Sequence, residues 1–211
     1  MAQTTSSALA VAGEKIVKRP PGRPRSQQAR TAILRSTLKL LRKSGYPDLS
    51  IEAIAAEANV GKATVYRWWT SKAALVADAF SSTAVAELHF PDTGSVLADL
   101  SMQMKQLVRV FRSPRGKMVA AILGGGLFDA ELIDAYRERF LLPRRREAYQ
   151  TLERGIERGE LPAHLDKDLM LDSLYGPIYM RFILRHDELS EEFVERLCRQ
   201  IMAGVARNRA I

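Results

Sequence analysis

The sequence predicts an all-α protein with a small N-terminal helical domain and a larger C-terminal helical domain. Apolar residues recur at spacings of three and four residues along much of the chain, and this period gathers them on one face of an α-helix. Ser residues stand just before several of these runs, where a hydroxyl group can accept a hydrogen bond from the first helical turn. Gly and Pro residues separate the runs, as they do at helix ends.

The first long helix is predicted over residues 26–44. Ser26 can cap its start, and Gly45 follows its end. Its apolar stripe consists of Ile33, Leu34, Leu38 and Leu41. We expect this stripe to pack against the next two helices in a small three-helix bundle.

A pair of short helices is predicted between Ser50 and Trp68. Ser50 can cap the first of them, and apolar residues then follow at i, i+3, i+4 and i+7. Asn59 tolerates the left-handed conformation that ends a helix, and Gly61 permits a tight turn. Two short helices joined in this way form either a helix-turn-helix, whose second helix can enter the major groove of DNA, or a generic helical hairpin.

A fourth helix is predicted from Ser71 to about Glu87, and five or six more are expected in residues 91–211. The later helices are placed at residues 95–112, 117–123, 130–142, 167–185 and 190–206. Gly124-Gly125-Gly126 predicts the end of one of them, because glycine is unfavourable inside a helix. Pro143 marks either a new helix or a kink, and Gly176-Pro177 predicts an interruption of the helix that contains it.

The positive charge of the chain is concentrated near its N-terminus. The net charge is +8, yet residues 1–72 hold 13 Lys and Arg against 4 Asp and Glu, while the remainder holds 19 against 20. A cationic surface confined to the helix-turn-helix favours binding to the phosphates of double-stranded DNA. Residues 1–25 are expected to form a disordered basic arm. In it, Arg23 and Arg25 belong to a Gly-Arg-Pro segment that is similar to an AT-hook, which enters the minor groove, or they only add nonspecific affinity.

The run SIEAIAAEANVGKATVYRWWTSKAAL, within residues 28–80, closely resembles the DNA-binding domain of the TetR/AcrR family of transcriptional regulators. That family has a Gly-rich turn, a recognition helix ending in an aromatic pair, then Ser-Lys and an apolar helix. Trp68-Trp69 departs from the His-Phe or Tyr-Phe more usual there, and Ala73 replaces a frequent Glu. Neither departure falls on an expected base-reading position.

The resemblance implies a role in DNA binding for specific residues. Lys62 would lie near base edges, and Tyr66 would donate its hydroxyl to a phosphate. Trp69 would wedge the recognition helix against the core or reach the DNA backbone. A cation in a first helical turn opposes the helix dipole, so Lys72 is expected to contact a phosphate, with an exposed lysine of no consequence as the alternative. The residues expected to bind DNA are Arg23, Arg25, Thr31, Ser50, Gly61, Lys62, Thr64, Tyr66, Arg67, Trp69 and Lys72.

The last two helices carry broad apolar faces, which predict either a homodimer with a four-helix interface or ordinary packing within one chain. The resemblance also implies the homodimer. The residues expected at its interface are Leu171, Leu174, Ile178, Phe182, Phe193, Val194, Leu197 and Ile201.

Met, Phe and Tyr residues between the two ends suit a pocket for an apolar or aromatic small-molecule effector, or a plain core. The existence of a pocket is mainly implied by the family. The residues expected to line it are Met104, Phe111, Met118, Phe128, Tyr136, Phe140, Tyr175 and Tyr179.

The sequence contains no catalytic constellation, so neither enzyme activity nor a cofactor is expected. His89, His164 and His186 are scattered without metal-ligand spacing, and no metal site is predicted. The single Cys198 is expected to be a packed thiol and suits a reducing, cytoplasmic compartment. No apolar run approaches the roughly 18 residues that span a bilayer, so no membrane association is expected.

The sequence therefore predicts three segments: a basic arm over residues 1–25, a helix-turn-helix DNA-binding domain over 26–72, and a helical ligand-binding and dimerisation domain over 73–211. The function expected is that of a ligand-responsive repressor acting as a homodimer on a palindromic operator. The alternatives are an activator, a ligand-independent regulator, or a small-molecule-binding helical protein with a nonspecific basic arm.

Overall fold

The computed structural model describes residues 26–84 and 88–207, and within these ranges it contains helices and no β-strand. The all-α prediction is confirmed, while Arg23 and Arg25 lie outside the described residues. The elements are α1 Gln27–Ser44, α2 Ile51–Glu57, α3 Lys62–Tyr66, α4 Lys72–Ala84, α5 Val96–Arg112, α6 Pro114–Gly126, α7 Ala130–Tyr136, the π-helical turn η2 Arg137–Leu141, α8 Leu142–Glu157, α9 Lys167–Leu184 and α10 Glu191–Arg207.

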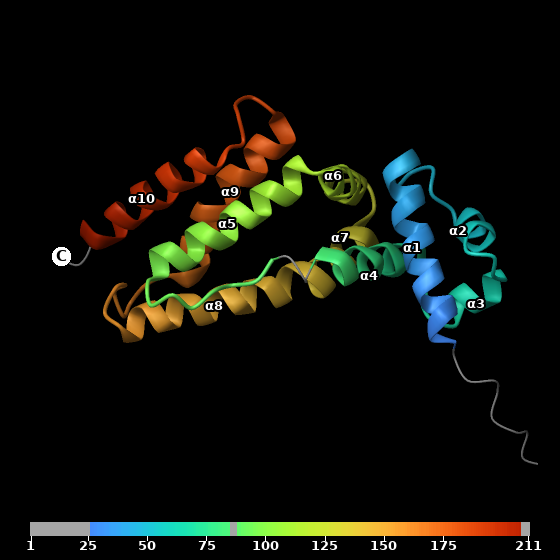
Figure 1. Cartoon of the computed structure of the whole chain (residues 1–211), viewed down its shortest axis with the longest axis horizontal. Helices are drawn as coiled ribbons and strands as arrows, with labels where there is room; N and C mark the ends of the chain where they lie inside the picture. Colours follow the sequence, from blue (N-terminus) through green and yellow to red (C-terminus); the bar gives the residue numbers. More distant parts are fainter. Residues whose placement is uncertain (1–25, 85–87, 208–211) are drawn as a thin grey trace, which may run out of the picture.

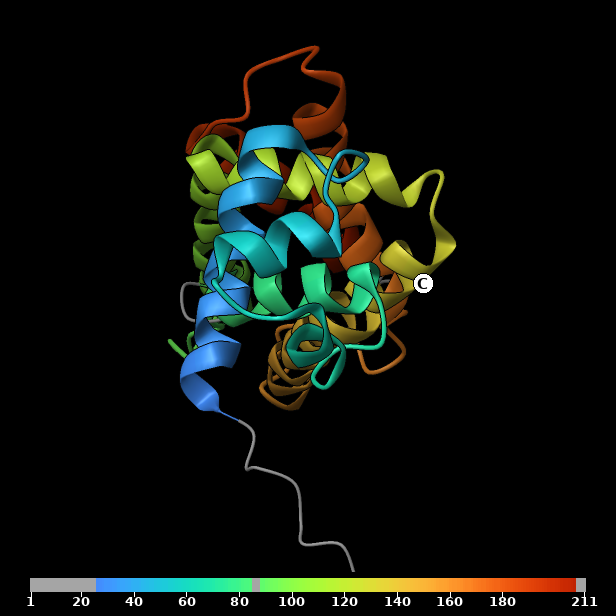
Figure 2. The same ribbon diagram turned by 90° about the vertical axis from the view of Figure 1, so that its right-hand side faces the viewer.

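The helices are arranged along one long axis (Figure 1). The first three helices lie at one end, and α5, α8, α9 and α10 run side by side toward the other. Between them, α4 packs against both α1 and α7, and α6 packs against α1. Figure 2 looks along the long axis from the N-terminal end, where α1, α2 and α3 lie in front of the rest of the molecule. The boundary predicted between residues 72 and 73 falls at the start of α4, the helix that contacts both parts.

Serine side chains cap the N-terminal helices as predicted. The Oγ atoms of Ser26, Ser50 and Ser71 accept hydrogen bonds from backbone N–H groups three residues later, at 3.3, 3.1 and 3.1 Å. Each bond satisfies a donor that has no partner within its own helix. Asn59 adopts the left-handed conformation with φ of 53°, so the predicted turn between α2 and α3 is also confirmed.

The helix predicted to end before Gly124 continues through the glycine run and ends at Gly126. Gly124, Gly125 and Gly126 all lie inside α6. A Cβ on Gly125 would come within 2.9 Å of the Tyr46 ring, and one on Gly126 within 3.0 Å of Ile133. The missing side chains therefore allow α6 to approach the α1–α2 loop and α7 closely, and this packing outweighs the intrinsic helix cost of glycine.

Two prolines behave differently inside helices. Pro177 does not interrupt α9, which is continuous across Gly176-Pro177, so that predicted break is wrong; burial of its neighbours Leu174 and Ile178 offsets the lost hydrogen bond. Pro143 begins a new helix, as one of the two alternatives predicted. It lies in the first turn of α8 directly after η2, where Leu142 N–H donates to the carbonyl of Arg137, five residues back.

Cys198 lies in the core of the fold. Cys198 is buried with its Sγ 3.5 Å from Met104 Sδ, and burial raises the pKa of its thiol to about 11, as fits a packed rather than a reactive cysteine. Among the described residues no cluster of His, Cys, Asp or Glu could hold a metal ion. The helices in the described ranges are too short or too polar for any of them to cross a membrane.

Gly116→Ala and Gly124→Ala test the close packing of the start of α6 on the end of α5. A Cβ at Gly116 would lie 2.0 Å from the carbonyl oxygen of Phe111, whereas one at Gly124 would meet nothing within 4 Å. We expect Gly116→Ala to lower the free energy of unfolding by about 3 kcal/mol and Gly124→Ala to raise it by about 0.5–1 kcal/mol. Urea denaturation measures both. Equal effects of the two substitutions would contradict the packing described for α6.

Candidate DNA-binding surface and effector pocket

The second helix of the pair, α3, is fixed by one buried side chain and exposes the rest. Val65 is fully buried, and the turn is closed by a hydrogen bond of 2.9 Å from Val60 N to Ala55 O. Gly61, Lys62, Tyr66 and Arg67 are exposed, with Thr64 half-buried. Basic, hydroxyl and aromatic groups therefore share the exposed side of α3, which is the composition needed to contact a DNA groove.

Lys62 is held beside α2 by an exposed ion pair. Its Nζ lies 2.5 Å from Oε1 of Glu52, and both side chains are more than half exposed. The hydrogen bond to Lys62 lowers the pKa of Glu52, and the same bond raises the pKa of Lys62. Because exposed pairs contribute little to stability, Lys62 can exchange this carboxylate for a DNA acceptor at small cost.

Trp69 lies in the core, and its prediction as a DNA contact is wrong. Its side chain is 3% exposed, and Nε1 donates to Oδ2 of Asp78 on α4 at 2.9 Å. Arg30 on α1 binds the same Oδ2 at 2.7 Å and lies 5.8 Å from the Trp69 ring centroid. Of the two roles predicted for Trp69, the structure shows the wedge between recognition helix and core.

Asp78 also faces the C-terminal helices. Arg139, in the π-helical turn η2, places Nη1 at 3.9 Å from Oδ1 of Asp78. Its backbone carbonyl accepts a hydrogen bond of 3.2 Å from the hydroxyl of Ser81 on α4. The Asp78 carboxylate on α4 therefore links α1, the segment between α3 and α4 that contains Trp69, and η2.

Lys72 has partners within the chain, which explains a cation in the first turn of α4. Its Nζ donates to the carbonyl of Tyr46 at 3.2 Å and lies 4.1 Å from the Tyr46 ring centroid. The Tyr46 hydroxyl donates to Oδ2 of Asp129 at 2.7 Å. Lys72, Tyr46 and Asp129 thus form a second connection between the N-terminal helices and α7, and Lys72 is half-buried rather than freely presented.

The other residues predicted to contact DNA lie on α1, at the start of α2 and directly after α3. Thr31 is exposed and borders a shallow depression together with Gln27, Gln28 and Arg35. Ser50 is half-buried and uses its hydroxyl as a helix cap. Arg67 Nη2 lies 3.5 Å from Thr64 Oγ1, so its guanidinium stays near the exposed side of α3.

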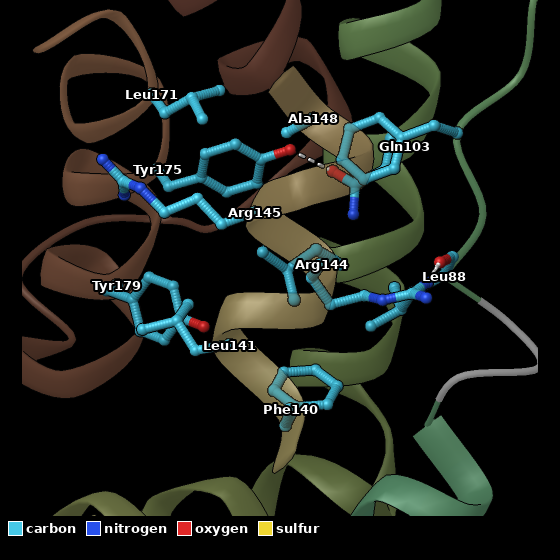
Figure 3. A pocket seen from close by; sticks show the side chains of 12 residues that line it. Leu88, Gln103, Phe140, Leu141, Arg144, Arg145, Ala148, Leu171, Tyr175 and Tyr179 are labelled. Atoms are coloured by element: carbon cyan, nitrogen blue, oxygen red, sulfur yellow. Dashed lines mark hydrogen bonds between the residues drawn. The ribbon is translucent and has the colours of Figure 1, made fainter. Parts of the chain in front are cut away.

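A pocket lies between α5, α8 and α9 (Figure 3). Its cavity volume is about 70 Å³, which is below the usual range for small-molecule sites, so a larger ligand would need the walls to move apart. The lining residues are Leu88, Phe90, Gln103, Leu107, Phe140, Leu141, Arg144, Arg145, Ala148, Leu171, Tyr175 and Tyr179.

Three of the eight predicted lining residues reach this pocket. They are Phe140, Tyr175 and Tyr179. Met104, Phe111, Met118 and Tyr136 are buried in the core behind it. Phe128 is 94% exposed, so its prediction as a pocket residue is wrong; it follows α6 at a turn where no helix covers it.

Sequence reasoning missed the polar residues of the pocket. Gln103 sits among apolar neighbours on the buried face of α5, and its Oε1 accepts from the Tyr175 hydroxyl. Arg144 and Arg145 directly follow Pro143 at the start of α8. A basic run in a first helical turn opposes the helix dipole, and this was the available signal that those side chains are held for another purpose.

The predicted dimer interface is largely interior. Leu171, Leu174, Ile178, Phe193 and Val194 are at most 9% exposed within a single chain, so they cannot form a contact between chains. Phe182, Leu197 and Ile201 are half-buried. The apolar side chains that α9 exposes are different ones: Leu169, Met180, Ile183 and Leu184, each 56–64% exposed.

Comparisons with known proteins match both parts of this structure. Residues 33–79 match the family model described as bacterial regulatory proteins, tetR family, and residues 90–201 match the model described as tetracyclin repressor-like, C-terminal domain. The chain belongs to the TetR family. It is therefore a helix-turn-helix transcriptional regulator, and the resemblance found in the sequence is confirmed.

Individual relatives match most of the length of the chain. The HTH-type transcriptional regulator YdeS of Bacillus subtilis is 39% identical over 189 residues, which is 90% of this chain and 96% of the relative. The DNA-binding transcriptional repressor TetR of Mycobacteroides abscessus is 27% identical, covering 87% and 96%. The solved structure of the TetR family regulator SCO0332 has a TM-score of 0.72 at 32% identity, covering 85% of this chain and 99% of that one.

Tyr46→Phe and Asp129→Asn test the connection between the N-terminal helices and α7. Each should lower the free energy of unfolding by about 1 kcal/mol, and the double variant should lose little more than either single one. Asn keeps the cap on α7, where Asp129 Oδ1 now accepts from Leu132 N at 3.1 Å. Additive losses in urea denaturation would show that the two side chains do not interact.

The same contact predicts a pH dependence in acid. The hydrogen bond from Tyr46 lowers the pKa of Asp129, so its stabilisation is complete above the ordinary Asp pKa near 4 and is lost as the pH falls through the lower folded value. Asp129→Asn should remove this part of the acid dependence, measured as unfolding free energy between about pH 6 and pH 2.

Proposed function

We propose that this regulator is a ligand-responsive repressor that binds a palindromic operator as a homodimer. The observation that carries the proposal is the chain of contacts from the pocket to the helix-turn-helix. Phe140 lines the pocket and packs edge-to-face on Phe80 of α4, with ring centroids 4.9 Å apart. The neighbouring Arg139 faces Asp78, which holds Arg30 and Trp69 at the other side of α4.

The exposed side of α3 is the surface we assign to base and phosphate contact. Lys62 suits guanine acceptors, and the Tyr66 hydroxyl suits a phosphate. Gly61 allows close approach of the backbone, and Thr64 and Arg67 complete the helix surface. Thr31 and Ser50 would lie beside this surface, and Lys72 would add positive charge near it. Arg23 and Arg25 would add a minor-groove contact.

A homodimer would place two copies of α3 about 34–36 Å apart, one turn of DNA, on the two halves of the operator. The surface we assign to dimerisation is the exposed face of α9 around Met180 and Ile183, since four large apolar side chains there are left to solvent. Half-buried Phe182, Leu197 and Ile201 would contribute the part of their side chains that remains exposed.

The ligand would act by binding two dimer arrangements with different affinity. In one, the recognition helices match the half-site spacing; in the other they do not, and only a ligand that distinguishes the two shifts the balance. Movement of Phe140 and Arg139 on ligand binding would change the position of α4, and α4 carries the helix-turn-helix. Loss of sequence-preferring binding would be the response.

Gel shift against the DNA upstream of the gene tests the regulator and its readout. Tyr66→Phe should weaken binding about threefold to tenfold on all sequences, because it removes one hydroxyl contact to phosphate. Lys62→Ala should alter the preference among operator variants. Arg196→Ala, an exposed charge on α10, is the control and should change neither. Salt-insensitive binding without sequence preference by the native protein would contradict the proposal.

Met180→Glu tests the dimer face. An uncompensated charge in an apolar interface is strongly unfavourable, so we expect the dimer dissociation constant to rise at least about a hundredfold in sedimentation equilibrium. Met102→Glu on α5 is the matched control, since Met102 is also about half exposed, at 46%. An unchanged dimer for Met180→Glu, or equal dissociation for both variants, would place the interface elsewhere.

A further inference from the structure

We propose that the pocket takes an apolar, ring-containing molecule bearing a neutral carbonyl oxygen, which accepts hydrogen bonds from Arg144 and Gln103. The inference rests on the proposed function in that this pocket is the effector site. It adds the chemical class of the effector, which follows from the donors that the pocket leaves unused and from its already paired charges.

The walls of the pocket are apolar and partly aromatic. Phe90, Phe140, Tyr175 and Tyr179 contribute rings, and the aliphatic lining is Leu88, Leu107, Leu141, Ala148 and Leu171. Burial raises the pKa of Tyr175 and of Tyr179, so both phenols remain uncharged. A ring system therefore finds apolar surface and ring faces here, while a molecule with many polar groups would lose more hydration than it regains.

Arg144 leaves one donor unused. Its side chain is 14% exposed; one terminal nitrogen donates to the Leu88 carbonyl and the other to Glu147. Its Nε is buried without a hydrogen-bond partner in the described structure. A buried N–H without an acceptor is unfavourable, and a ligand oxygen that reached it would relieve this.

Gln103, on α5, adds a second donor. Its Oε1 accepts from the Tyr175 hydroxyl, which fixes the amide in the arrangement shown by the dashed line in Figure 3. The amide nitrogen then remains to donate. Arg144 and Gln103 therefore each offer a donor beyond their existing bonds, which favours a ligand that supplies an acceptor.

The charges in the pocket are already balanced, which favours a neutral acceptor over a carboxylate. Arg144 is paired with Glu147. Arg145 is paired with both Asp168 and Asp172, at 2.6 and 2.7 Å, and its guanidinium is turned away to these partners. A carboxylate entering here would meet no unpaired cation and would lose its own hydration.

Three naphthalene probes of similar size test the class of ligand directly. The first is 2-acetylnaphthalene, the second is 2-isopropenylnaphthalene, in which CH₂ replaces the carbonyl oxygen, and the third is 2-naphthoate. Titration calorimetry on the full-length protein without DNA should give about tenfold tighter binding of the ketone than of the hydrocarbon. Naphthoate should bind more weakly than the ketone.

Variants assign the preference to its donors. Arg144→Lys keeps a cation but lacks the Nε donor, and should reduce the ketone-to-hydrocarbon ratio to about two or three. The double variant Gln103→Leu with Tyr175→Phe removes both members of the second pair and should also reduce it, with little loss of stability. Arg146→Lys, an exposed position on α8 outside the pocket lining, is the matched control and should leave the ratio unchanged. Because the readout is a ratio between probes of equal shape, a merely structural defect would not move it.

The outcomes separate this inference from the proposed function. Equal binding of ketone and hydrocarbon, tightest binding of naphthoate, binding of no probe, or a ratio unaffected by Arg144→Lys would each overturn the inference. A ketone preference that depends on Arg144 supports it. If that preference appears but the ketone does not change operator binding in a gel shift, the inference stands and the ligand-responsive function fails.

Discussion

The carboxylate of Asp78 is the interaction on which the relation between the two parts of the molecule depends. It is 24% exposed, and it accepts from Arg30 and from the indole of Trp69 while facing Arg139. A partly buried carboxylate is stable only when its oxygens are bonded, so α1, the end of the recognition segment and η2 must keep their positions around α4. Trp69, which stands where the family more usually has Phe, has a physical reason here, since its indole supplies the N–H that a phenyl ring lacks.

The sequence was sufficient for features set by neighbouring residues. Ser26 and Ser50 cap their helices because the cap requires a hydroxyl only three residues from its donor, and Asn59 turns because of its own side chain. The end of α6 was predicted three residues too early, since Gly125 and Gly126 pack on Tyr46 and Ile133, which are distant in the sequence or beyond a turn. Local propensity argues for a break there, and tertiary packing overrides it.

The interface and pocket residues show a second limit of prediction from the sequence pattern. Helical period identifies an apolar face but not what covers it, so Leu171 and Ile178 in the core are indistinguishable by pattern from side chains that would meet a second chain. Exposed Met180 and Ile183 lie on the same helix, which is apolar nearly all round. In the pocket, Phe140, Tyr175 and Tyr179 followed from residue type, whereas Gln103 and Arg144 depend on the spatial meeting of α5 with α8.

The π-helical turn η2 affects which side chains of α8 face the pocket. A π-turn is equivalent to one extra residue inserted in an α-helix, and one residue rotates the following side chains by about 100° around the helix axis. Arg144 and Arg145 follow this turn, so their direction is set by the register offset as well as by their position in the chain. Removal of one residue from the turn would bring other side chains to the pocket wall. Two relatives with the same α8 sequence but different turns would thus present differently shaped pockets, and ligand range could diverge without any change in a lining residue.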